Sequence, residues 1–207
     1  MHGEQGLRER KKEATRLALR EAALRLALER GVDHVTVGMI CADVDVSQRT
    51  FFNYFSTKEE CLLHMDVGAA DWIPDAVLRR PVTEAPLAVV RAVVLELAAS
   101  IQTRKREVLL RARLITEHSH LRARYLAGYE VFERRLTEGL ITRFGAALSE
   151  DLRLPVLSAV GLGVLRAEFP RWCEKDDRSL PEMVDTAFET LEQHVLARAK
   201  EQDHERC

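Results

Sequence analysis

The sequence lacks the residue patterns on which most enzymes and metal-binding proteins depend. The four cysteines lie far apart and form no C-x-x-C pair, namely Cys41, Cys61, Cys173 and Cys207. They therefore indicate neither a disulfide framework nor a zinc site. No glycine-rich nucleotide loop, no H-E-x-x-H and no G-x-S-x-G is present, and the neighbouring pairs of acidic residues point to different helix faces. We expect no catalytic residue, no cofactor and no bound metal.

Long apolar runs and a strong net charge are also missing. No run approaches the length of a membrane span, and the charged start MHGEQGLRERKK has no apolar segment behind it, so we expect neither a signal peptide nor a membrane partner. The net charge of −2 argues against a general nucleic-acid binder, but residues 8–30 hold eight arginines and lysines against four glutamates. With 207 residues, 46% of them hydrophobic and 31% charged, the chain has the composition of a globular protein with a core.

Hydrophobic periodicity indicates helices throughout and no strand. The first helix is expected over Arg8–Arg30, with Leu19, Ala22, Ala23, Leu26 and Ala27 as its buried stripe and Gly31 as its end. Residues 73–83 are expected to form a linking loop. Together with the segment described next, the periodicity predicts an all-α fold of about nine helices, the later ones over Lys58–Trp72, Leu87–Thr103, Val108–Thr116, Leu121–Phe144, Leu152–Cys173 and Leu180–Ala199.

The segment Thr36–Leu63, TVGMICADVDVSQRTFFNYFSTKEECLL, carries most of the functional information. Its first half has one apolar stripe at helical spacing that Thr36 can cap, formed by Val37, Ile40, Cys41 and Val44. After an interruption, Ser47 can cap a second helix that reaches Phe55 and buries one face. Thr57 and Glu60 have capping-box spacing for a third helix. Two short helices joined by a tight turn predict a helix-turn-helix unit.

The remaining faces of the second helix are polar or aromatic. Hydroxyl, amide and guanidinium groups of this kind read base edges and phosphates in a DNA major groove. Lys58 stands at the start of the third helix, where a cation is useful if a phosphate lies over that helix start. Lys11, in the basic first helix, is expected to contact the DNA backbone. The expected DNA-binding residues are Lys11, Thr36, Ser47, Gln48, Arg49, Thr50, Phe52, Asn53, Tyr54 and Lys58.

Over Leu17–Met65 the chain closely resembles the DNA-binding signature of the TetR family of bacterial transcriptional regulators. Two positions depart from that signature: Asp45 replaces the usual glycine, and Phe52 replaces the usual tyrosine, which removes a hydroxyl that contacts phosphate. The resemblance implies a helix-turn-helix domain over residues 1–66 and a helical effector-binding and dimerisation domain over residues 67–207. It also implies a cytoplasmic homodimer that binds a palindromic operator in the bacterial nucleoid.

The resemblance further implies a repressor that a small apolar or amphipathic ligand releases from DNA. Two alternatives remain open, a ligand-promoted activator and a regulator controlled by oxidation of Cys41 or Cys61. The expected pocket residues are Trp72, Arg111, His118, Tyr125, Tyr129, Phe132, Phe169 and Trp172. Ala159 and Gly163 are small and four apart, which favours close helix approach in a dimer. The expected dimer residues are Leu157, Gly161, Leu165, Phe188, Leu191 and Val195.

Overall fold

The computed structural model describes residues 2–63, 70–145, 153–174 and 178–193. Over these ranges the chain forms ten α-helices and one short 3-10 helix, and they contain no strand. The all-α prediction is confirmed. Packing divides the chain into two compact units. Unit 1 comprises residues 1–69 and 110–128, and unit 2 comprises residues 70–109 and 129–207.

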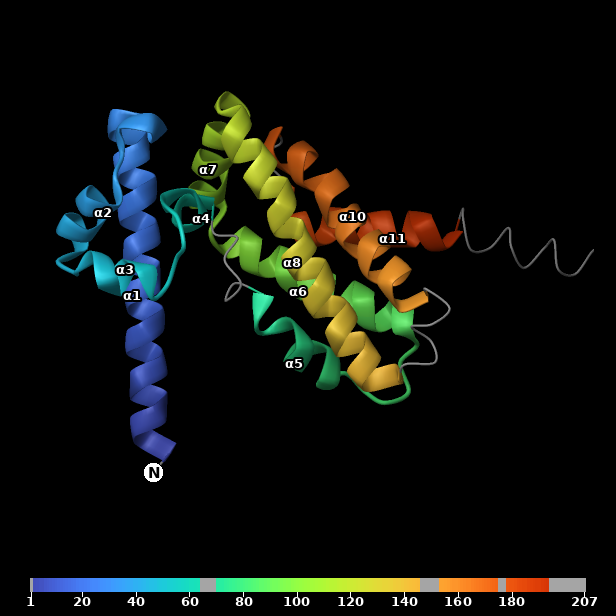
Figure 1. Cartoon of the computed structure of the whole chain (residues 1–207). Coiled ribbons are helices and arrows are strands. Elements are labelled where there is room, and N and C mark those ends of the chain that lie inside the picture. Colours follow the sequence, from blue (N-terminus) through green and yellow to red (C-terminus); the bar gives the residue numbers. More distant parts are fainter. Residues whose placement is uncertain (1, 64–69, 146–152, 175–177, 194–207) are drawn as a thin grey trace, which may run out of the picture. The chain divides into compact units, whose positions relative to one another are not determined.

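Helix α1 (His2–Arg30) forms the backbone of unit 1. Its predicted apolar stripe is buried along the whole central part of the helix, at Leu19, Ala22, Ala23, Leu26 and Ala27. The helix ends at Gly31, whose φ of +85° is a conformation that side-chain-bearing residues rarely adopt. Figure 1 shows the remaining short helices of unit 1 beside this long one.

Three short helices complete the helix-turn-helix segment: α2 (Val37–Val44), α3 (Gln48–Phe52) and α4 (Lys58–Leu63). Helix α3 is shorter than predicted, because Asn53 and Tyr54 form a turn before the chain reaches Phe55. Residues 64–69, which fall within the predicted fourth helix, lie outside the described residues. Trp72, expected to end that helix, instead precedes a separate one.

Helices α7 (Lys105–Glu117) and α8 (Ser119–Phe144) contribute to both units. Leu114 of α7 and Leu121 of α8 are buried in the same apolar cluster as the helix-turn-helix core. Residues 110–128 therefore pack with unit 1, which differs from the expected division of the chain at residue 66. Sequence order alone could not reveal that residues 110–128 belong to unit 1, because they are more than 40 positions away from the rest of that unit in the sequence.

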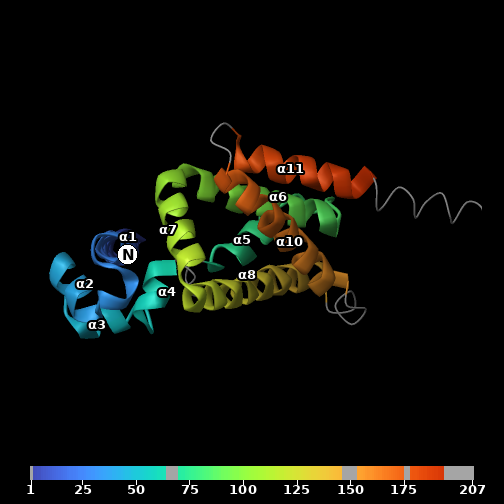
Figure 2. The same ribbon diagram turned by 90° about the horizontal axis from the view of Figure 1, so that it is seen from above.

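Unit 2 contains α5 (Ile73–Leu78), α6 (Pro86–Thr103), α10 (Arg153–Glu174) and α11 (Leu180–Leu191). The predicted loop over residues 73–83 was wrong in its first half, since α5 forms there. Pro74 lies in the first turn of α5, where its missing N–H is not needed. Helix α5 packs against α6 (Figure 2). It also approaches α8, because a Cβ atom added to Gly139 would lie 3.1 Å from Cα of Pro74.

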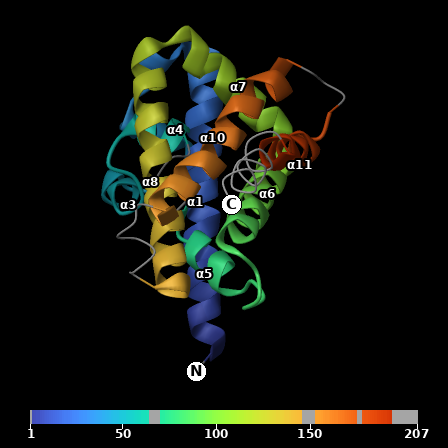
Figure 3. The same ribbon diagram turned by 90° about the vertical axis from the view of Figure 1, so that its right-hand side faces the viewer.

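Helix α6 is the central helix of unit 2 and packs against both α10 and α11 (Figure 3). It is long and apolar enough to cross a membrane by length and composition alone, which the sequence analysis did not anticipate. Its valines Val89, Val90, Val93 and Val94 are buried, so this apolarity serves the core of unit 2. Ser179 is the N-cap residue of α11, but its side chain makes no capping hydrogen bond. The backbone N–H of Leu180 instead donates to Oε1 of Gln102 at 3.0 Å.

Candidate functional sites

The turn between α2 and α3 has the geometry of a helix-turn-helix. Asp45 has a φ of 56°, so it adopts the left-handed conformation that glycine usually provides, as expected from its position. The Val46 N–H then donates to the Cys41 carbonyl at 3.0 Å and closes the turn. Two hydroxyls act as helix caps: Thr36 accepts from Met39 N–H at 3.2 Å, and Ser47 accepts from Thr50 N–H at 3.0 Å. These caps fix the direction in which α3 leaves the turn.

Helix α3 presents its polar faces to solvent. Phe51 is completely buried, and Phe55 just beyond the helix is 1% exposed, so the apolar side of this segment faces the core of unit 1. Gln48, Arg49 and Asn53 are exposed. The three side chains expected to read base edges therefore protrude from a helix that is braced from behind. Of the other predicted DNA-binding residues, Lys11, Thr36, Ser47 and Phe52 are exposed, and Thr50, Tyr54 and Lys58 are partly buried.

Gln48 lies close to the first turn of α2. A Cβ atom added to Gly38 would lie 3.3 Å from Nε2 of Gln48, tighter than an ordinary contact. The absence of a side chain at Gly38 therefore leaves room for the Gln48 amide beside α2. Sequence reasoning did not identify Gly38, because a glycine in the first turn of a helix carries no particular signal.

Lys58 has partners inside unit 1. Its Nζ donates to the carbonyl oxygens of Val32 and Val35 at 3.0 and 2.8 Å, and so ties the start of α4 to the connection between α1 and α2. An ammonium group has three N–H donors, so one remains for an outside partner such as a phosphate. Lys58 thus has a structural role in unit 1, and its contact with DNA stays a prediction.

Two arginines outside the helix-turn-helix segment hold α4 at its ends. Arg124 of α8 donates to the Thr57 hydroxyl at 3.2 Å, and Glu60 N–H donates to the same hydroxyl at 3.1 Å. At the other end, Nε of buried Arg111 donates to the Leu62 carbonyl at 2.5 Å. No sequence pattern pointed to these contacts, since each joins residues more than 40 positions apart.

The predicted effector-pocket residues are divided between the two units. Arg111, His118 and Tyr125 belong to unit 1: Arg111 is buried against α4, Nδ1 of His118 lies 3.0 Å from the Leu114 carbonyl, and Tyr125 packs on the unit 1 core. Their role in an effector pocket stays a prediction. The other predicted pocket residues lie in unit 2, namely Trp72, Tyr129, Phe132, Phe169 and Trp172.

Trp172 is the most distinctive of the unit 2 candidates. It is fully buried, and its ring lies 5.8 Å from that of Phe169 and 5.6 Å from the Lys105 ammonium. Its indole Nε1 has no hydrogen-bond partner among the described residues. A buried N–H without an acceptor costs about 1–3 kcal/mol, so an acceptor from a ligand would remove a local penalty.

Three of the predicted dimer residues lie in the core of unit 2. Phe188 is fully buried and Leu165 is 2% exposed, and a Cβ atom on Gly161 would overlap Val90 of α6. The small residue at Gly161 thus permits close approach of α10 to α6 within the chain, which corrects its assignment to a dimer contact. Leu157 and Leu191 are partly exposed, and Val195 lies outside the described residues.

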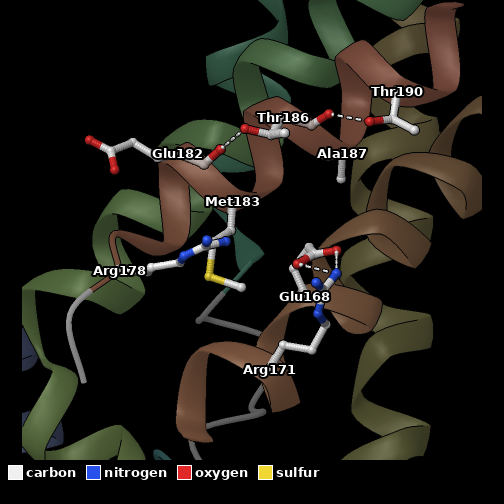
Figure 4. Close-up of a pocket in the computed structure, with 8 residues that line it drawn as sticks. All are labelled: Glu168, Arg171, Arg178, Glu182, Met183, Thr186, Ala187 and Thr190. Carbon is white, nitrogen blue, oxygen red and sulfur yellow. Dashed lines mark hydrogen bonds and ion pairs between the residues drawn. The ribbon is translucent and has the colours of Figure 1, made fainter. Parts of the chain in front are cut away.

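Helices α10 and α11 nevertheless leave an open surface. A groove of about 660 Å³ runs between them, and Figure 4 shows Glu168 and Arg171 on one side, paired at 3.0 Å, with α11 side chains on the other. Beside it, α10 carries a second, exposed stripe of small apolar residues. This stripe follows helical spacing and comprises the exposed residues Val156, Ala159 and Ala167 together with the half-buried Gly163.

The described cysteines do not resemble redox sensors. Cys41 and Cys61 are buried in unit 1, and burial raises the pKa of the Cys41 thiol. In unit 2, burial and the neighbouring Glu174 raise the pKa of Cys173 to about 11. A thiol with a raised pKa is less often ionised and reacts more slowly with oxidants, which disfavours Cys41 and Cys173 as sensors, and Cys61 is disfavoured by its burial.

Comparisons with known proteins agree with this architecture. Residues 19–65 match the family described as bacterial regulatory proteins, tetR family, and residues 84–196 match the MftR C-terminal domain. The HTH-type transcriptional regulator TcmR of Streptomyces glaucescens is 34% identical over 192 residues, which cover 89% of this chain and 84% of that protein.

Two solved structures share the fold. The first is Thermus thermophilus FadR, a TetR-family repressor in complex with lauroyl-CoA, at 23% identity and a TM-score of 0.55, covering 85% of this chain and 92% of that one. The second is a transcriptional regulator from Aquifex aeolicus VF5, at 19% identity and a TM-score of 0.50, covering 86% and 98%.

The fold and the exposed faces of α3 define a helix-turn-helix DNA-binding protein. The family matches specify it further, and the chain belongs to the TetR family of bacterial transcriptional regulators. It is a DNA-binding regulator and not an enzyme, and a bacterial regulator of this kind acts in the cytoplasm. Membership in this family implies operator DNA and small-molecule effectors as partners.

Proposed function

We propose that the protein is a repressor that binds a palindromic operator as a homodimer and leaves it when a small apolar or amphipathic ligand binds. One observation carries the DNA-binding part of this proposal. Gln48, Arg49 and Asn53 are exposed on α3, while Phe51 on the opposite face is completely buried. A helix held in this way can enter a major groove without unfolding its support.

The direct test is binding to the DNA upstream of the protein's own gene, measured by fluorescence anisotropy at several salt concentrations. We expect specific binding that weakens as salt increases, because phosphate contacts release counterions. Replacement of Gln48 or Arg49 should change the preferred sequence. Equal affinity for all duplexes in the wild type would argue against a specific regulator.

The proposed dimer rests on the exposed stripe of α10 and the groove beside α11. Small side chains at Ala159 and Gly163 permit close helix packing, and the groove offers both charge signs, with Glu168 and Arg171 on α10. Binding to successive major grooves would require the two α3 helices of the dimer to lie about 34–36 Å apart, one turn of DNA. Gly163→Arg should give a monomer by light scattering and abolish operator binding, whereas a wild-type monomer at micromolar concentration would contradict the proposal.

The proposed effector site includes Trp172. Its unpartnered indole N–H and the neighbouring Phe169 suit a ligand with an apolar body and one hydrogen-bond acceptor. In a Trp72→Phe variant, Trp172 is the remaining tryptophan and reports on its own surroundings. A ligand that releases DNA should shift this emission. Release without any shift would place the effector elsewhere.

The sign of regulation is tested by transcription from the operator-bearing promoter with and without the protein. Repression relieved by the ligand is expected, and transcription that rises only when protein and ligand are both present would indicate a ligand-promoted activator. Oxidation of Cys41 or Cys61 is the less suitable control mechanism, because both thiols are buried.

A further inference from the structure

Phe52 is an unusual side chain for the surface of α3. Among the described residues, seven large apolar side chains are exposed, and Phe52, at 55%, is the aromatic one. The other six are Leu17, Leu28, Leu78, Val82, Leu126 and Val156. A bare phenyl ring has no polar group through which to bind water or phosphate. Its exposure on α3 leaves the ring available to an apolar group outside the chain.

The ring of Phe52 is supported from below. It stands edge-on to the ring of Phe51, with centroids 5.5 Å apart and an interplanar angle of 86°, and Phe51 is itself completely buried. Helical spacing places Phe52 three and four residues after Arg49 and Gln48, so the three side chains share one exposed region of α3. The apolar ring is thus held among the groups that are proposed to contact base edges.

A B-DNA major groove offers few apolar surfaces, and the C5-methyl group of thymine is the one that identifies a base. Apolar side chains, phenylalanine among them, recognise this methyl group by direct contact. We propose that Phe52 reads a thymine methyl group in each half-site of the operator. This inference rests on the proposed function, because it requires α3 to lie in the major groove.

The experiment deletes only the methyl group. The probe is the tightest-binding duplex that the full-length protein selects from random-sequence DNA, with each thymine replaced in turn by deoxyuridine, and affinity is measured by fluorescence anisotropy. One buried methyl is worth about a fourfold change in affinity, so we expect a loss of about fourfold for one symmetric thymine and about fifteenfold when both half-sites are changed.

Three variants identify the side chain that senses the methyl group. Phe52→Ala should bind the thymine and uracil duplexes equally, whereas Phe52→Tyr, which keeps the ring, should retain the wild-type difference. Leu28→Ala is the matched control, because Leu28 is an exposed apolar residue of unit 1 that lies on α1 and not on α3. It should also retain the difference. Melting temperatures close to wild type confirm that each variant is folded.

Each outcome decides between the possibilities. The inference is overturned if no thymine is sensitive in the wild type, or if Phe52→Ala keeps the full sensitivity. Either result leaves the proposed function intact, since the protein still selects a duplex. If the wild type selects no duplex at all, the proposed function fails together with this inference.

Discussion

Helix α3 in unit 1 and helix α10 in unit 2 both carry residues that were expected to contact another molecule. The two helices differ in whether those residues are exposed. On α3 the expected contacts are exposed, with Gln48, Arg49 and Asn53 on the surface. On α10 the expected contacts Gly161 and Leu165 are buried against the rest of unit 2. The exposed positions of α3 leave its predicted DNA contacts possible, whereas two of the predicted dimer contacts of α10 are covered by the same chain.

The difference arises from the number of apolar faces on each helix. A helix of five residues such as α3 has room for one core-facing position, at Phe51, and every other face must be outside. Helix α10 has 22 residues and two apolar stripes, one against α6 and one exposed. Periodicity shows that such a helix has two apolar faces. It cannot show which of them packs against other helices of the same chain.

The largest expected effect is a difference in the free energy of unfolding between variants of two adjacent residues of α3. Phe51→Ala should destabilise unit 1 by about 3–5 kcal/mol, since it removes a fully buried ring from a packed core. Phe52→Ala should change stability little, because the ring is more than half exposed. Both tryptophans belong to unit 2, so urea unfolding should be followed by circular dichroism. Equal destabilisation by the two changes would contradict this view of α3.

On α10 two glycines offer a matched pair. Gly161→Ala should cost about 1–3 kcal/mol, because the new methyl group would overlap Val90. Gly163 has no atom within 4 Å of an added Cβ, so Gly163→Ala should be neutral or stabilise by up to about 1 kcal/mol through helix propensity. Thermal unfolding of the two variants tests the assignment of the buried and exposed faces. If Gly163→Ala lowered the stability more than Gly161→Ala, the buried and exposed faces of α10 would have been assigned the wrong way round.

Arg49→Ala should affect DNA binding and leave stability unchanged. A side chain that pairs with a base edge is worth about 1–3 kcal/mol of discrimination per half-site, and Arg49 is exposed on α3. Binding to the selected operator and to duplexes changed at one position should be compared for wild type and variant. If the order of preference among the duplexes is unaltered, Arg49 does not read bases.

Lys58→Ala and Lys12→Ala distinguish a structural lysine from an exposed one. Lys58→Ala should lower stability by about 1–2 kcal/mol, because its ammonium group binds two backbone carbonyls. It should also weaken binding to all sequences. Lys12 is exposed on α1, so its replacement should leave stability unchanged and at most flatten the salt dependence of binding. A stable Lys58→Ala variant would show that those two bonds contribute little.

The smallest effect is expected from oxidation. Cys41 and Cys61 are buried in unit 1, so dilute peroxide should leave operator affinity unchanged. The matched control is the Cys41→Ser, Cys61→Ser double variant, which should show the same affinity before and after treatment. Loss of binding in the wild type alone would restore the redox-controlled alternative.

Much of the helix-turn-helix was predictable because its determinants are local. Thr36 and Ser47 cap helices a few residues away, and Asp45 stands at a turn whose backbone requires a positive φ. The burial of Phe51 and Phe55 follows from their spacing of four. These relations lie within about ten residues of one another, so sequence order and helical geometry are enough to specify them.

Tertiary structure alone decided which groups meet across the chain. It placed Arg111 on the Leu62 carbonyl and Lys58 on two carbonyls in the connection between α1 and α2, and it brought residues 110–128 into unit 1. It also chose the face of α10 that packs on α6. Helical periodicity gives the positions of residues within one helix but not the distance between helices that are remote in sequence, whereas hydrogen bonds and steric overlap between helices depend on that distance and on their relative orientation.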